Sequence, residues 1–254
     1  RRDNSTVPAR DRTRMTYRRT MVDPAAWSTE LESLEPAAWP GYLGQHSGLP
    51  GPRANLPLAA AAAIAADESV IDELLRDGGE YQTLCAAAAL GRRSSEPAVE
   101  ARARALATDE RWRVREGVAI GLQLLGDVNP AVVPPIVLRW ADDPDPLVQR
   151  AAAAAICEPR LLRTPEAAAV AIEVCRRATD HLIAFETQRR KQDDARTLRQ
   201  ALAYCWSVAF GQLRPMGAGR CRDGHRRLVG DAGGGGAMTD RSPLLRDQPS
   251  ARRA

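Results

Sequence analysis

A nine-residue, alanine-rich segment that occurs twice constrains the fold of this chain more than any other feature. Residues 56–64 read LPLAAAAAI and residues 148–156 read VQRAAAAAI, so six of the nine positions are identical. Alanine has the highest helix propensity and a very small side chain, which suits helices that pack closely. A unit that recurs along a chain indicates a stacked array in which neighbouring units bury each other. We therefore predict an all-α protein built from repeated helices.

Three further segments follow the same template, more loosely, and begin at residues 84, 114 and 198. Together the five copies are spaced by 28, 30, 34 and 50 residues. The first three spacings fit repeats of two helices each. The last spacing predicts a longer helix or an insertion before the fifth copy.

A second helical pattern follows each of the first four copies. Apolar residues at spacings of three and four place one apolar face on each of these segments. The predicted second helices span residues 69–76, 97–107, 130–140 and 165–179.

The segments between these helices carry their own signals. Thr164 is a predicted N-cap, because a threonine side chain accepts a hydrogen bond from the first turn of a helix. The glycines in 78–79 and 126–127 are predicted C-caps. The acidic segment 142–146 is predicted to turn into the next helix, where carboxylates favour the positive end of the helix dipole.

Two central stretches, 111–127 and 142–155, resemble HEAT repeats of the kind also found in phycobilisome-lyase-like proteins. The positions that match the family pattern are Trp112, Val114, Arg115, Ala119, Leu122 and Gly126. The second stretch departs from it at Gln149, where arginine is usual. The resemblance covers roughly residues 54–210, and the whole chain is also similar to uncharacterised HEAT-repeat proteins of high-GC bacteria. It implies an α-α superhelix, a HEAT-like solenoid of helix pairs.

Composition divides the chain into four predicted parts. Residues 1–21 form an Arg-rich extension that we interpret as disordered or artefactual, with Met15 and Met21 as candidate starts. Residues 22–53 form an aromatic capping segment. Within it we predict a short helix that starts near Pro24 or Ser28 and runs through Leu34, after which four prolines are expected to break regular structure. Residues 54–210 form the repeat domain, and residues 211–254 form a disordered Gly/Arg-rich tail. Because no amphipathic segment follows the fifth copy, we expect the natural C-terminal part of the array to be missing.

Charge lowers the expectation of nucleic-acid binding. Each terminal segment contributes a net charge of +5 while the whole chain carries +4, so residues 22–210 carry −6. An acidic body does not suit a phosphate backbone. The five cysteines form no CxxC pair, which suits a reducing cytoplasm. The longest apolar run, 58–66, is too short to span a membrane.

Three groups of residues are candidate binding sites. The candidates are Trp112, Arg113, Arg115, Trp140, Arg189, Arg190 and Lys191. The two arginines near residue 114 indicate either an anion-binding patch or pairing of Arg115 with a turn carboxylate such as Asp127 or Asp143. The tryptophans indicate either a stacking platform or core packing, and the pattern favours core. The basic run 189–191 is either a solvated insertion or a binding loop, because insertions in repeats gather on one face.

No catalytic, cofactor or metal site is predicted, because no Cys/His zinc spacing and no Ser-His-Asp arrangement is present. The sequence favours a non-catalytic scaffold that binds a protein partner. One alternative is a DNA-binding protein resembling the alkylation-repeat DNA glycosylases. A second alternative is a phycobilisome-lyase-like or chaperone-like role.

Overall fold

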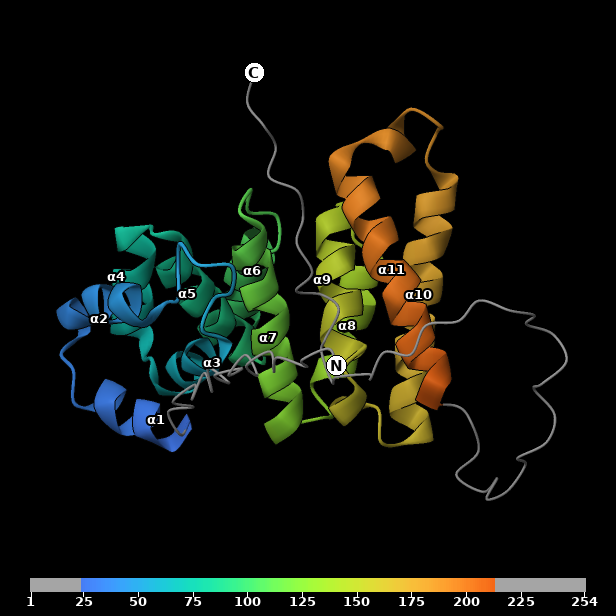
Figure 1. Cartoon of the computed structure of the whole chain (residues 1–254). Coiled ribbons are helices and arrows are strands. Elements are labelled where there is room, and N and C mark those ends of the chain that lie inside the picture. The colour runs from blue at the N-terminus through green and yellow to red at the C-terminus, as the bar shows by residue number, and fades with distance from the viewer. Residues whose placement is uncertain (1–23, 213–254) are drawn as a thin grey trace, which may run out of the picture.

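The computed structural model describes residues 24–212, and this part of the chain is entirely helical (Figure 1). Eleven α-helices and three short 3-10 helices follow one another, and residues 24–212 contain no strand. The predicted all-α superhelix is therefore confirmed. The prediction for residues 1–21 lies outside the described residues, as does the tail predicted over 211–254 from residue 213 onward. Gly211 and Gln212 belong to helix α11 (Asp193–Gln212), so the predicted start of that tail at residue 211 is wrong.

Helices alternate in direction from α3 onward, as a stack of helix pairs requires. The helices that carry the five sequence copies, here called first helices, are α3 (Leu56–Ala65), α5 (Glu80–Arg92), α7 (Trp112–Val128), α9 (Pro146–Ile156) and α11 (Asp193–Gln212). The second helices are α4 (Glu68–Asp77), α6 (Pro97–Leu106), α8 (Val133–Ala141) and α10 (Pro165–Ala184). Each second helix overlaps the segment predicted for it, and the 3-10 helix η2 (Pro159–Leu161) precedes α10.

The N-terminal segment is more regular than its prolines predict. It forms α1 (Pro24–Glu32), η1 (Pro36–Ala38) and α2 (Trp39–His46). Pro40 lies in the first turn of α2, where a missing backbone N–H costs nothing, so it begins a helix rather than breaking one. Gln82 of α5 donates a hydrogen bond to the Pro40 carbonyl at 2.9 Å, which fixes α2 against the repeats. That the segment caps the first repeat stays a prediction.

Backbone contact between α5 and α7 sets the closest packing in the described chain. A Cβ atom added at Gly121 would lie 2.2 Å from the Ala88 carbonyl oxygen, and one at Gly117 would lie 2.5 Å from that of Leu84. Only glycine permits this approach. The contact on α5 falls in a run of buried alanines, Ala86 to Ala89, and the Ala87 methyl group lies beside Gly117. Small residues therefore join these two first helices directly.

Helix ends follow the local sequence at several positions. Thr164 accepts a hydrogen bond from the Ala167 N–H, which confirms the predicted N-cap. Gly78 ends α4 with φ of 74°, a left-handed conformation that suits glycine. The predicted C-cap at Gly126 is wrong, because α7 continues to Val128 and ends at Asn129. Gly126 instead faces Leu161, whose methyl groups occupy the space beside it.

The long spacing before the fifth copy has two sources. Helix α10 contains 20 residues, and a connector with the 3-10 helix η3 (Arg189–Lys191) follows it. Both a longer helix and an insertion are present.

Candidate functional site

Arginines of one repeat pair with carboxylates of the preceding repeat along the second helices. Arg102 of α6 pairs with Asp72 of α4 at 2.6 Å, and Arg139 of α8 pairs with Glu100 of α6 at 2.5 Å. Arg177 of α10 continues the series. These pairs neutralise charge across the repeats, so the second helices present no basic stripe for a phosphate backbone.

The predicted residues around α7 are held by intramolecular contacts. Arg113 pairs with Glu80 at 3.2 Å and stacks over the Trp112 ring at 4.7 Å. Arg115 donates hydrogen bonds to the backbone carbonyls of Asp109 at 2.6 Å and Glu110 at 2.9 Å. Burial, and then repulsion from Arg150, lowers the pKa of Arg115.

The predicted pairing of Arg115 with Asp127 or Asp143 is wrong. Asp127 lies 12 residues further along the same helix, about 18 Å away at the helical rise, and it pairs with Arg160 at 3.0 Å. Asp143 pairs with Arg104 of α6 at 2.5 Å. Each of these two aspartates thus pairs with an arginine of a neighbouring repeat, and the order of residues in the sequence does not identify such pairs.

Trp140 is a core residue. It is 2% exposed, and its indole N–H donates a hydrogen bond to a Glu100 carboxylate oxygen at 2.9 Å. A ring in this position offers no face for stacking on a nucleobase. Trp112 is half-buried beneath Arg113.

The basic run before α11 is largely engaged as well. Arg189 forms two hydrogen bonds of 2.6 Å to Asp194 and stacks over Phe185 at 4.8 Å. Arg190 is half-buried and Lys191 is exposed. Within residues 24–212, no hydrogen bond, ion pair or ring contact joins this run to Trp112 or Trp140. The seven predicted residues therefore do not form one patch.

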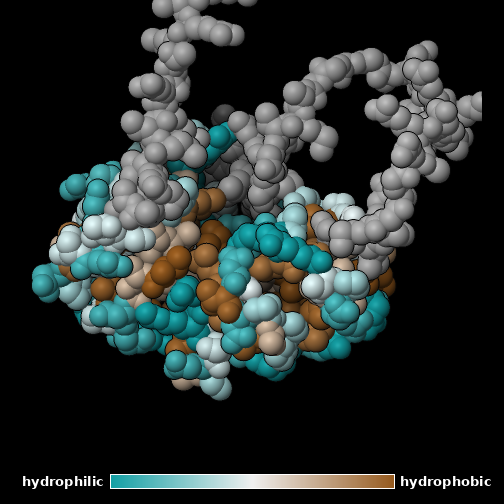
Figure 2. Space-filling view, turned by 90° about the horizontal axis from the view of Figure 1, so that it is seen from below, coloured by the Kyte–Doolittle hydropathy of each residue, from teal (hydrophilic) through white to brown (hydrophobic). Residues whose placement is uncertain are grey.

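A different surface gathers exposed apolar residues. Ile64, Val128 and Phe210 lie in the last turns of α3, α7 and α11, and they are 51%, 65% and 56% exposed. Because first helices run in the same direction, these ends share one edge of the array, here called the lower edge after its place in Figure 1. Figure 2 views the molecule from below and shows apolar residues gathered along the middle of this face, bordered by hydrophilic ones. Exposed apolar residues that cluster in this way indicate an interaction surface.

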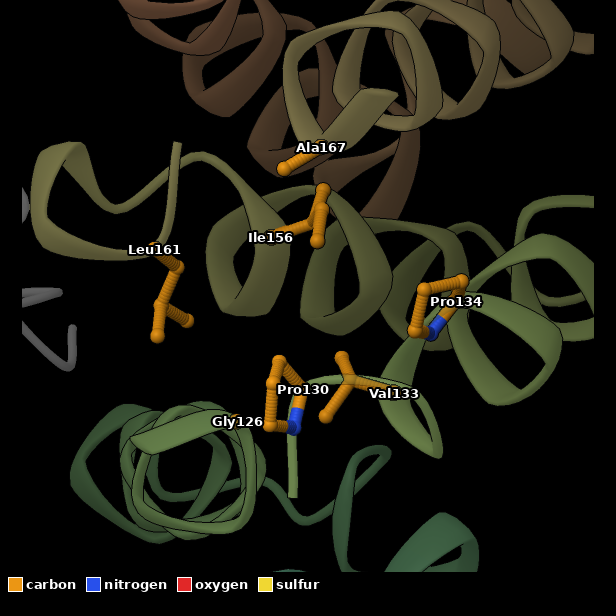
Figure 3. A pocket seen from close by; sticks show the side chains of 7 residues that line it. All are labelled: Gly126, Pro130, Val133, Pro134, Ile156, Leu161 and Ala167. Atoms are coloured by element: carbon orange, nitrogen blue, oxygen red, sulfur yellow. The ribbon is translucent and has the colours of Figure 1, made fainter. Parts of the chain in front are cut away.

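A small apolar notch opens in the lower edge between two repeats (Figure 3). Its volume is about 50 Å³. It is lined by Gly126, Pro130, Val133, Pro134, Ile156, Leu161 and Ala167. The walls come from the ends of α7 and α9, the starts of α8 and α10, and η2. A cavity of about 150 Å³ holds a benzene ring, so this smaller notch suits the tip of one aliphatic side chain.

Sequence reasoning missed the notch because its walls come from several helix ends and a 3-10 helix that are spread over residues 126–167. The available signal is the apolar character of residues 128–134 at a helix end, a stretch in which the sequence pattern predicts a capped turn and the start of a second helix.

Residues 68–157 match the family described as HEAT repeats. This part of the chain is similar to HEAT repeats, and its helix pairs stack as a HEAT-like solenoid. No curated protein and no solved structure matches the chain. Within residues 24–212, no group of three or more His, Cys, Asp or Glu side chains is arranged to hold a metal ion. None of the described helices is long and apolar enough to cross a membrane.

Proposed function

We propose that this HEAT-repeat protein is a non-catalytic scaffold that binds a protein partner through its lower edge. The observation that carries this proposal is the apolar notch, together with the exposed Val128, which lies in the sequence between Gly126 and Pro130 of the notch lining. Repeat arrays present extended surfaces for binding, and HEAT repeats generally serve protein interactions. A partner would place an aliphatic side chain in the notch and cover the surrounding apolar residues.

Two features support a protein partner over a nucleic acid. The body 22–210 carries a net charge of −6, and the arginines of the second helices already pair with carboxylates. A cytoplasmic location stays a prediction that rests on cysteine usage alone.

The test compares partner capture by three forms of the full chain: wild type, Val128→Asp and Ile183→Asp. Val128 and Ile183 are both aliphatic and both 65% exposed, which makes Ile183 a matched control. Ile183 lies in the last turn of α10, at the opposite edge, because α10 runs against the first helices. We expect wild type and Ile183→Asp to capture the same partner and Val128→Asp to lose it. If all three forms captured the partner equally, the lower edge would not be the binding surface.

A further inference from the structure

Three thiols meet where α9, α10 and α11 pack together. Cys157 directly follows α9, Cys175 lies in α10 and Cys205 lies in α11, and each is at most 2% exposed. The sulfur atoms of Cys157 and Cys175 are 3.7 Å apart, and Cys205 lies within hydrogen-bonding reach of Cys157. All three thiols are free. The arrangement brings together cysteines from three elements that are distant in the sequence.

The backbone around Cys157 favours closure of the short gap to Cys175. A disulfide has a sulfur–sulfur length of about 2.05 Å, so the two sulfurs need to approach by less than about 2 Å. Cys157 caps the end of α9 with φ of −81° and ψ of 46°, outside the regular helix. Cys175 is held within α10. We therefore expect Cys157, rather than Cys175, to move when the two sulfur atoms approach each other.

Packing of α11 controls access to this pair. Leu202, Cys205 and Ala209 of α11 are buried, and the Trp206 indole N–H donates a hydrogen bond to the Thr179 hydroxyl of α10 at 3.1 Å. Hydrogen bonds to Cys175 and Cys205, and then burial, raise the pKa of Cys157 far above its ordinary value. A protonated thiol is a poor nucleophile. The cluster is therefore unreactive until α11 opens locally.

We propose that Cys157 and Cys175 form a reversible disulfide by exchange with a small-molecule disulfide, such as oxidised glutathione, when α11 opens. The Cys157 thiolate attacks one sulfur of the oxidant and releases one thiol, which leaves a mixed disulfide. The Cys175 thiolate then attacks the Cys157 sulfur and releases the second thiol. The protein loses two electrons, and the two cysteine protons end on the two released thiols.

The disulfide closes the loop of residues 157–175, which contains two residues of the notch, Leu161 and Ala167. Oxidation therefore fixes one wall of the notch. This consequence rests on the proposed function of the lower edge, whereas formation of the bond does not.

The experiment incubates the native full chain with oxidised glutathione, in a Cys221→Ser background so that the thiol of the Gly/Arg-rich segment takes no part. We expect an intact mass lower by about 2 Da, reversal by dithiothreitol, and a Cys157–Cys175 peptide after digestion. Cys175→Ser should abolish the mass loss. Cys85→Ser is the matched control, since Cys85 is 1% exposed and outside the cluster, and it should retain the mass loss.

A further variant tests access. Trp206→Phe removes the indole N–H that bonds to Thr179, so it should raise the oxidation rate several-fold. Four intact thiols after prolonged incubation, or a Cys157–Cys205 bond instead, would overturn the proposal. An oxidation rate unaffected by Trp206→Phe would overturn the control by α11. Because mass is read without any partner, these results are independent of the capture test on Val128.

Discussion

Arg150 of α9 forms an ion pair with Glu116 of α7, and about nine-tenths of each side chain is buried. Nη1 of Arg150 has no hydrogen-bond partner among the described residues. Two charges in such surroundings lose most of their hydration, and their mutual attraction offsets this loss while both are present. The pair therefore fixes how two consecutive first helices sit against each other.

Removing one partner of this pair should be severe. We expect Arg150→Met to lower the free energy of unfolding by about 3–5 kcal/mol, because the Glu116 carboxylate stays buried without compensation. Arg139→Met is the matched control, since Arg139 also pairs with the preceding repeat but is 58% exposed, and it should cost about 0–1 kcal/mol. Urea denaturation measures both. Replacing both partners, as Glu116→Leu with Arg150→Met, should restore most of the lost stability. Equal losses of stability in Arg150→Met and Arg139→Met would contradict the assignment.

Gly121→Ala should destabilise the interface of α5 and α7. The added Cβ meets the Ala88 carbonyl oxygen at 2.2 Å, and backbone cannot rotate away as a side chain does. The two helices must separate, at a cost of about 1–3 kcal/mol. In Gly41→Ala, within α2, the new Cβ meets nothing within 4 Å, so that change should be neutral or stabilise by about 0.5–1 kcal/mol. Thermal melts of both variants check this, and the prediction fails if Gly121→Ala melts at or above wild type.

The N-cap of α4 should give a pH-dependent contribution to stability. Hydrogen bonds from the Ser69 hydroxyl and the Val70 N–H lower the pKa of Asp67 below its ordinary value of 3.8. Because the pKa is lowered in the folded state, the carboxylate contributes its full stabilisation at pH values above the pKa of the unfolded chain. That stabilisation is lost as the pH falls through the pKa of the folded state. Asp67→Asn keeps a capping oxygen without the titration. We expect the stability difference between wild type and Asp67→Asn to shrink as pH falls from about 5 to about 3. Urea titrations at each pH measure this difference in stability. A difference that stays constant over the range would contradict the prediction.

Overpacking should test the buried alanine run. Ala153 in α9 has no exposed surface, so Ala153→Phe should cost about 1–3 kcal/mol. Ala169 in α10 is exposed, and Ala169→Phe should change the melting temperature little. A melt of Ala153→Phe that matched wild type would count against burial of this run.

The helices were predictable because their signals are local. Two kinds of signal, alanine runs such as 151–155 and apolar residues spaced by three and four, lie within one or two helical turns. Together they predict the positions of all five first helices. Gly126 shows the limit, because the same residue type ends α4 at Gly78 and packs beneath Leu161 inside α7. Which role applies depends on a neighbour 35 positions away.

The candidate site was less predictable for the same reason. Arg115 and Trp140 were chosen for their chemistry. Arg115 bonds instead to carbonyls of the connector that precedes its own helix, and Trp140 is buried and bonds to Glu100 of the preceding repeat. The notch depends on how two consecutive helix pairs meet, because its lining comes from residues 126–134 of one pair and 156–167 of the next. Its location follows from the stacking of the repeats.

The glycine contact of α5 with α7 also has a mechanical consequence. A superhelix under load changes its curvature where neighbouring helices separate most easily. Gly117 and Gly121 bring the backbones of α5 and α7 into direct contact, so these two helices have little room to move against each other. At the other end of the array, α11 buries longer side chains, Leu198 and Leu202, which adjust by rotation. We therefore expect the array to bend less between α5 and α7 than at α11. The notch lies between these two regions, where α7 and α8 meet α9 and α10.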